Sequence, residues 1–185
     1  SPMYRVNLVE GDNSTTTGEA TAIEPSFTAA SYYNTGTEVT LNYVGSLASD
    51  GTALYVADGS HNLIRKIDLT TSNISTLAGK LENYADGTGE NGEFHYPDKM
   101  VRVGTNMYVI DDYRIRKVDS ATGAVSTLQT SGASYSYIER LTTDGTDIYF
   151  TSYVSNVNKL FKLSVADGVV SELQTSGGSD NSSSS

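Results

Sequence analysis

The stretch "DGTALYVADGSHNLIRKIDLTTSNISTLAG", residues 50–79, decides the fold because the chain repeats it twice. The later copies are "VGTNMYVIDDYRIRKVDSATGAVSTL", residues 103–128, and "DGTDIYFTSYVSNVNKLFKLSVADGVVSEL", residues 144–173. Each copy contains short runs in which apolar and polar residues alternate, the pattern of half-buried β-strands. A supersecondary unit that recurs along a chain predicts an array of structural repeats.

The register of the copies supports this prediction. From the second strand of the first copy to its third, Ile67 and Leu77 are 10 positions apart, and the other copies keep that spacing. The first hairpin loop varies, because the opening glycine lies 14, 12 or 16 positions before the equivalent residue of the second strand, which is Arg65, Arg116 or Phe161. Side chains alternate between the faces of a strand, so steps of two keep each residue on its own face. We therefore expect the central tyrosines of the copies to occupy equivalent buried positions; they are Tyr55, Tyr108 and Tyr149.

A fourth strand precedes the opening glycine of each copy and completes a unit of four short strands. Such units, at a period of about 40 to 50 residues, are the signature of β-propeller blades. We predict an all-β fold with a propeller-like array of three four-stranded blades. Within residues 44–173, the blades should cover residues 44–79, 99–128 and 138–173. We also expect an irregular N-terminal β segment over residues 1–43, as an extra blade or small sheet, and a Ser/Gly-rich tail or linker over residues 174–185.

The motif letters carry a resemblance over roughly residues 44–173. "LYVADGSHNLIRKIDLTTSNISTLAG", followed by "DGTGENGEFHYPDKM", resembles the NHL repeats of bacterial extracellular β-propellers. The third copy departs from the motif, because Ser152 replaces its aspartate and Phe161 its arginine. In the N-terminal segment, "YNTGTEVTL" resembles the small β repeat modules of bacterial surface proteins. The resemblance implies a propeller outside the cell or on its surface.

Composition limits the partners. With 12 basic and 22 acidic residues, the formal net charge of −10 repels phosphate backbones, so we expect no nucleic-acid partner. The sequence contains no apolar run near the roughly 20 residues that span a bilayer, so we expect no membrane insertion. Cysteine is absent, which excludes disulfides and thiolate metal ligands, while 13 tyrosines amid many Ser, Thr and Gly residues are typical of secreted all-β proteins. Because the chain begins at Ser1, we expect a processed or excised product.

Two acid and base pairs recur in the copies, Asp58 with Arg65 and Asp111 with Arg116. They could form a ring of charges that binds a ligand. We favour a structural role, because Arg65 shares a strand face with Ile67. The arginine stem would then pack between blades while its head pairs with the aspartate.

Candidates for metal binding and catalysis are sparse. In "DGTGENGEF", Asp86, Glu90 and Glu93 could hold calcium, but the loop lacks the alternating spacing of an EF-hand and could equally be solvated. The two histidines, His61 and His95, cannot supply the zinc set of the amidating lyases related to this family. A G-x-S-x-G nucleophile elbow is missing as well. We expect no enzymatic activity, no catalytic residue and no cofactor beyond that calcium candidate.

Tyrosines near turns are the candidates for binding. Such rings stack on sugars or anchor protein interfaces, although many pack at strand edges. The candidates are Tyr32, Tyr33, Tyr135 and Tyr137. The sequence therefore favours a non-enzymatic extracellular or cell-surface propeller that serves as a binding or scaffold module. The alternatives are a structural subunit of an extracellular filament or pilus-like assembly and, less favoured, a propeller lyase or hydrolase.

Three blades raise a problem of closure. A propeller closes with roughly 4 to 8 blades, and a blade buries its faces only against two neighbours. We expect the open side to be covered, either by residues 1–43 or by another protein or further copies of the chain. A glycan is a further candidate ligand.

Overall fold

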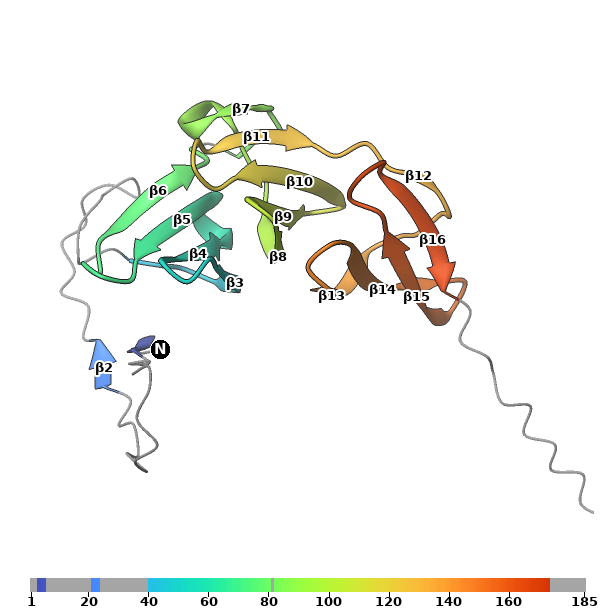
Figure 1. Cartoon of the computed structure of the whole chain (residues 1–185), viewed down its shortest axis with the longest axis horizontal. Coiled ribbons are helices and arrows are strands. Elements are labelled where there is room, and N and C mark those ends of the chain that lie inside the picture. Colours follow the sequence, from blue (N-terminus) through green and yellow to red (C-terminus); the bar gives the residue numbers. More distant parts are fainter. Residues whose placement is uncertain (1–2, 6–20, 24–39, 81, 174–185) are drawn as a thin grey trace, which may run out of the picture.

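Three sheets, each built on four antiparallel strands, follow one another in an arc (Figure 1). The structure is a computed structural model, and it describes residues 3–5, 21–23, 40–80 and 82–173. Among these residues the regular structure is β, with two single-turn 3₁₀ helices, η1 (Gly59–His61) and η2 (Gly89–Asn91). The prediction of an all-β array of three four-stranded units is confirmed.

Each sheet has the same order of strands. The first sheet consists of β3 (Val44–Ser49), β4 (Ala53–Asp58), β5 (Leu63–Asp68) and β6 (Ile74–Ala78). The second consists of β8 (Pro97–Val103), β9 (Asn106–Asp111), β10 (Arg114–Asp119) and β11 (Ala124–Thr127). The third consists of β13 (Ile138–Thr143), β14 (Ile148–Val154), β15 (Val157–Leu163) and β16 (Val169–Leu173). The first strands, β3, β8 and β13, line the concave side of the arc (Figure 1).

Short strands extend two of the sheets at the outer edge. Strand β7 (Gly87–Thr88) pairs with β11 in antiparallel fashion, and β12 (Ser131–Gly132) pairs with β16 in parallel. Separate from the three sheets, β1 (Met3–Arg5) pairs with β2 (Thr21–Ile23). Residues 40–43 of the predicted N-terminal segment lead into β3, and its other residues lie outside the described residues, as does the predicted tail, residues 174–185.

The opening glycines explain the tight hairpins that join the inner strand of each sheet to the next strand. Gly51, Gly104 and Gly145 have φ values of 89°, 60° and 94°, which are unfavourable for a side chain. Gly45 has another reason, because a Cβ atom there would collide with the backbone carbonyl of Asp98 on the neighbouring inner strand. That close approach lets β3 and β8 lie side by side, and Ser46 Oγ donates to the carbonyl of Met100 at 3.1 Å.

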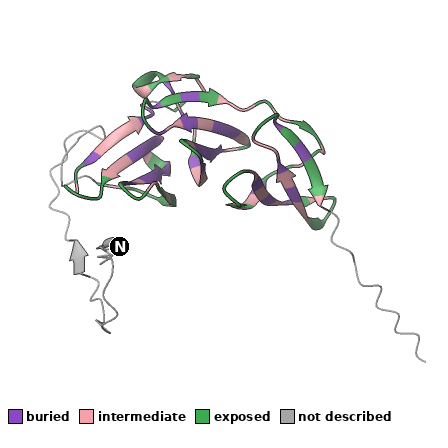
Figure 2. Cartoon of the chain, in the orientation of Figure 1, coloured by how far each residue is buried: buried purple, intermediate pink, exposed green. Residues whose placement is uncertain are grey.

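Alternation along the strands builds two apolar interfaces between sheets (Figure 2). Tyr55 and Ala57 on β4 pack in one cluster with Met107 and Val109 on β9. The other face of β9 contributes Tyr108 and Ile110 to a second cluster; its members from the third sheet are Ile138, Ile148, Phe150, Phe161, Leu163 and Val170. The second sheet therefore buries both faces, whereas each flanking sheet buries one face against it.

The three central tyrosines occupy equivalent strand positions but differ in burial. Tyr55 is 1% exposed and Tyr108 is 2% exposed, because each faces the following sheet. Tyr149 faces away from the second sheet and is only half-buried, so the expectation of equal burial is wrong for this residue. Its hydroxyl still donates to Asp144 at 2.9 Å, just as the Tyr55 hydroxyl donates to Asp50 at 2.6 Å.

Candidate binding surface at the start of the inner strands

The inner strands β3, β8 and β13 all begin at the same end of the arc. Each inner strand runs antiparallel to the next strand of its sheet, which is β4, β9 or β14. Its first residue therefore lies opposite a polar residue near the end of that strand. Val44 pairs with Asp58, Pro97 with Asp111, and Ile138 with Ser152. This end of the array also carries the connections between sheets.

These polar residues, Asp58, Asp111 and Ser152, each hold the segment that leads into the inner strand. Asp58 Oδ1 accepts the Asn42 amide at 3.0 Å, and Asp111 Oδ1 accepts the His95 amide at 2.9 Å. In the third sheet the Ser152 hydroxyl accepts the Ser136 amide at 3.1 Å. In all three sheets the partner lies 16 positions earlier in the chain, so Ser152 preserves the contact although it departs from the motif.

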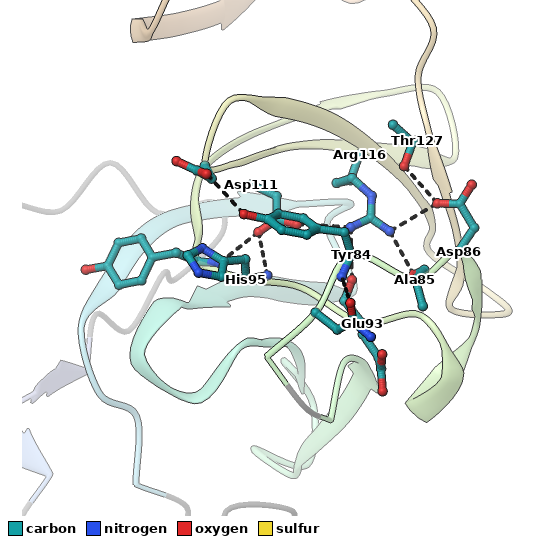
Figure 3. Close-up of polar contacts among 11 residues, drawn as sticks. Tyr84, Ala85, Asp86, Glu93, His95, Asp111, Arg116 and Thr127 are labelled. Carbon is teal, nitrogen blue, oxygen red and sulfur yellow. Dashed lines mark hydrogen bonds and ion pairs between the residues drawn. The ribbon is translucent and has the colours of Figure 1, made fainter.

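The guanidinium of Arg116 ties the connection between the first two sheets to the same point (Figure 3). It donates to Asp111 Oδ2 at 3.0 Å and Asp86 Oδ1 at 3.1 Å. It also donates to the carbonyls of Glu93 at 2.9 Å and Ala85 at 2.8 Å. Arg116 and Asp111 are 0% exposed, so these charges are not presented to solvent. Burial raises the pKa of Asp111, while amide bonds and the Arg116 charge oppose that change.

The equivalent position differs among the three sheets. Arg65 is also 0% exposed and donates to Asp58 Oδ2 at 3.2 Å and to Thr76 Oγ1 at 2.6 Å. In the third sheet Phe161 stacks on Phe150 with ring centroids 5.2 Å apart. All four predicted structural residues of the two pairs, Asp58, Arg65, Asp111 and Arg116, therefore lie in the interior.

Directly after each fixed segment comes an exposed tyrosine. Tyr43, Tyr96 and Tyr137 each immediately precede an inner strand, and they are 58%, 37% and 51% exposed. We call these residues the inner-strand tyrosines. Because the inner strands lie next to one another, the tyrosines form a row across three consecutive sheets.

Contacts join the members of this row. The rings of Tyr43 and Tyr96 lie 5.4 Å apart at 42°, and burial together with a hydrogen bond to Tyr43 raises the pKa of Tyr96. Lys99 Nζ donates to the Tyr137 hydroxyl at 3.0 Å and lies 4.9 Å from the centre of that ring. Lys99 also binds Asp98. Burial disfavours the Lys99 charge, but its hydrogen bonds to Asp98 and Tyr137 outweigh burial and raise its pKa.

A second aromatic group lies around His95, in the connection that leads to Tyr96. Tyr84 stacks on His95 with centroids 5.2 Å apart and donates to Asp112 Oδ2 at 3.0 Å. The Arg114 guanidinium lies 3.6 Å from the centre of the Tyr84 ring and 4.5 Å from that of Tyr113. Tyr113 is 61% exposed and borders a shallow hollow of about 420 Å³. The cation–π contacts of Arg114 thus lie at the same end of the array as that of Lys99 with Tyr137.

The predicted binding tyrosines differ in how far they are exposed. Tyr137 belongs to the exposed row, but Tyr135 packs edge-on against Phe150 at 4.9 Å and is half-buried. Tyr32 and Tyr33 lie outside the described residues. Sequence reasoning missed Tyr43 and Tyr96, although both lie eight positions before the opening glycine of their copy, as Tyr137 does.

Two of the three predicted calcium ligands, Asp86 and Glu90, contact other side chains. Asp86 Oδ1 accepts bonds from Arg116 and Thr127, and Glu90 pairs with Lys80 at 2.7 Å. Within the described residues, no three His, Cys, Asp or Glu side chains gather as a metal site. Nδ1 of His61 contacts Asp58 at 2.9 Å, whereas Nε2 of His95 contacts Glu82 at 3.0 Å. The structure does not bring Asp86, Glu90 and Glu93 together, and calcium binding by them stays a prediction.

Comparison with solved structures identifies the class of fold as a β-propeller. A chain of a nidogen/laminin complex matches with a TM-score of 0.63 at 15% identity, over 94% of this chain and 58% of that chain. Virginiamycin B lyase from Staphylococcus aureus matches with a TM-score of 0.54 at 15% identity, over 88% of this chain and 47% of the lyase. The extracellular domain of a hybrid two-component system from B. thetaiotaomicron matches with a TM-score of 0.51 at 12% identity, over 82% of this chain and 18% of that one.

These likenesses show the fold, and the chain spans less than two thirds of each matched protein. No protein-family model matches the chain, and no curated protein is significantly similar to it in sequence. The expectation of no enzymatic activity, which came from the sparse catalytic and metal-ligating residues, is contradicted, because virginiamycin B lyase shares the fold. In the described part of the chain, no helix has the length and apolar character needed to cross a bilayer.

Proposed function

We propose that the chain is part of an extracellular or cell-surface β-propeller, of the NHL-repeat type, that binds a protein partner through the inner-strand tyrosines. The observation that carries the proposal is the recurrence of an exposed tyrosine at the same position in three consecutive sheets. Exposed tyrosines in unrelated places need no explanation, but a contiguous aromatic row marks a binding surface.

The row is also held in place before any partner arrives. Buried acceptors at Asp58, Asp111 and Ser152 fix the backbone just ahead of each tyrosine. A tyrosine ring offers a large contact area with only two side-chain torsions to order, so little conformational entropy is lost on binding. Such fixed aromatic side chains are the residue type that dominates binding energy in protein interfaces.

The matched structures support this proposal through their fold alone. The nidogen/laminin structure is a complex, and another match is an extracellular domain. Neither likeness assigns a partner to this chain.

Selection from a displayed library of random peptides tests the proposal. The full chain serves as the target, and each recovered peptide is then titrated against Tyr43→Ser, Tyr96→Ser and Tyr137→Ser. Tyr149→Ser is the matched control, because Tyr149 is half-buried at the other end of β14, where its hydroxyl donates to Asp144. We expect recovered peptides to bind the control normally and the row variants at least about fivefold more weakly. Peptides that bind all four variants equally well would refute the assignment of the surface.

A further inference from the structure

The chemistry of the row narrows the kind of partner. Three phenol groups and the Lys99 ammonium provide ring faces and hydrogen-bond donors. The carboxylate of Asp98, on the same strand as Lys99, already binds that ammonium group. The surface is therefore matched to a ligand with flat apolar groups and hydrogen-bond acceptors.

The shape of the row favours an extended ligand. Tyr43 and Tyr96 lean together at 42° and form a shallow wedge, while Tyr137 lies in the next sheet with Lys99 against its ring. Tyr43 adopts a φ of 52°, an uncommon conformation for a bulky residue that fixes the turn into β3. The tyrosines follow one another from sheet to sheet, so a linear ligand can meet all three.

We infer that the row binds a proline-rich segment of the partner in the polyproline II conformation, an inference that rests on the proposed function. In this conformation the backbone carbonyls make no internal hydrogen bonds and remain available as acceptors. Proline lacks an N–H donor and presents a flat apolar ring. Aromatic-lined grooves recognise such segments because their conformation is already formed and loses little entropy.

A glycan fits the same surface less well. Sugar hydroxyls both donate and accept, so they are best satisfied where carboxylates or amides are free to accept. The Asp98 carboxylate is occupied by Lys99. The donors of Lys99 and Tyr137 are better satisfied by peptide carbonyls.

Fluorescence anisotropy with a labelled peptide of about ten prolines tests the inference on the full chain, beside a Gly/Ser peptide of equal length. We expect saturable binding of the proline peptide alone. Tyr43→Ser, Tyr96→Ser and Tyr137→Ser should each weaken it by about fivefold or more, while Tyr149→Ser, at the other end of β14, leaves it unchanged. Lys99→Met should weaken it as well. Tyr96→Phe keeps the ring, so it should bind more tightly than Tyr96→Ser; far-UV circular dichroism verifies that each variant is folded.

Other outcomes overturn the inference. They are no saturable binding, equal binding of the two peptides, and binding that the row variants leave intact. Oligosaccharides that bind through the tyrosines, with no binding of the proline peptide, would assign the row to glycans instead. Library peptides that require the tyrosines but contain no proline would refute this inference while leaving the proposed function standing.

Discussion

Replacing Asp111 with alanine should lower the free energy of unfolding by about 3 kcal/mol. The carboxylate is 0% exposed and accepts the amides of His95 and Tyr96 together with Arg116. Breaking a buried ion pair costs about 3 to 5 kcal/mol because the remaining charge stays buried without its partner. The lower end applies here, since Arg116 keeps Asp86 and two backbone carbonyls as acceptors.

Urea titration of the full chain measures this loss. Tryptophan is absent and 13 tyrosines are present, so tyrosine fluorescence and far-UV circular dichroism are the signals. Ser152→Ala is the matched control in the third sheet, where the equivalent position next to Phe161 accepts the Ser136 amide with a neutral hydroxyl. Losing that acceptor should cost about 1 kcal/mol.

A double variant isolates the charge. Arg116→Met removes the guanidinium that Asp111→Ala leaves behind, so the double variant should be at least about 1 kcal/mol more stable than Asp111→Ala alone. The reasoning is refuted if Asp111→Ala costs no more than Ser152→Ala. It is also refuted if Arg116→Met destabilises the Asp111→Ala protein further.

Three more predictions concern pH, metal and assembly. Hydrogen bonds lower the pKa of Asp144 from 3.8 to about 2 and that of Asp50 still further, so their contribution is complete above pH 4 and is lost as pH falls towards 2. Acid titration of Asp50→Asn should show a shallower loss of stability in that window, and an unchanged slope would contradict the assignment. Chelator should leave the melting temperature unchanged, whereas a fall of several degrees would indicate calcium at the Asp86 loop. Because the outward face of the third sheet carries Tyr149 and the exposed Tyr153, light scattering should show association once residues 1–43 are removed. Stable monomers with and without that segment would contradict the need for a cover.

Repetition made the fold predictable in some detail. Even steps in hairpin length fixed the face of each strand residue, so Tyr55, Tyr108 and Tyr149 align in the structure as they do in sequence. Alternation reports which residues share a face, but burial needs a neighbour to cover that face. Tyr149 shows the difference, because its face lies at the end of the described array. Two-residue strands such as β7 and β12 are too short to produce a periodic pattern at all.

The candidate surface was predictable only in part, since it depends on contacts between residues far apart in sequence. Asp111 attracts attention as a motif residue, yet its buried carboxylate holds the amide of Tyr96, 15 positions earlier. Tyr135 and Tyr137 look alike in sequence, but one packs on Phe150 and the other is 51% exposed. The motif residue thus fixes the backbone of a segment that precedes it by 15 or 16 positions, and the exposed tyrosine lies at the end of that segment. Tyr43, Tyr96 and Tyr137 each lie eight positions before the opening glycine of their copy, so extending the glycine alignment eight residues upstream would have shown them in one column.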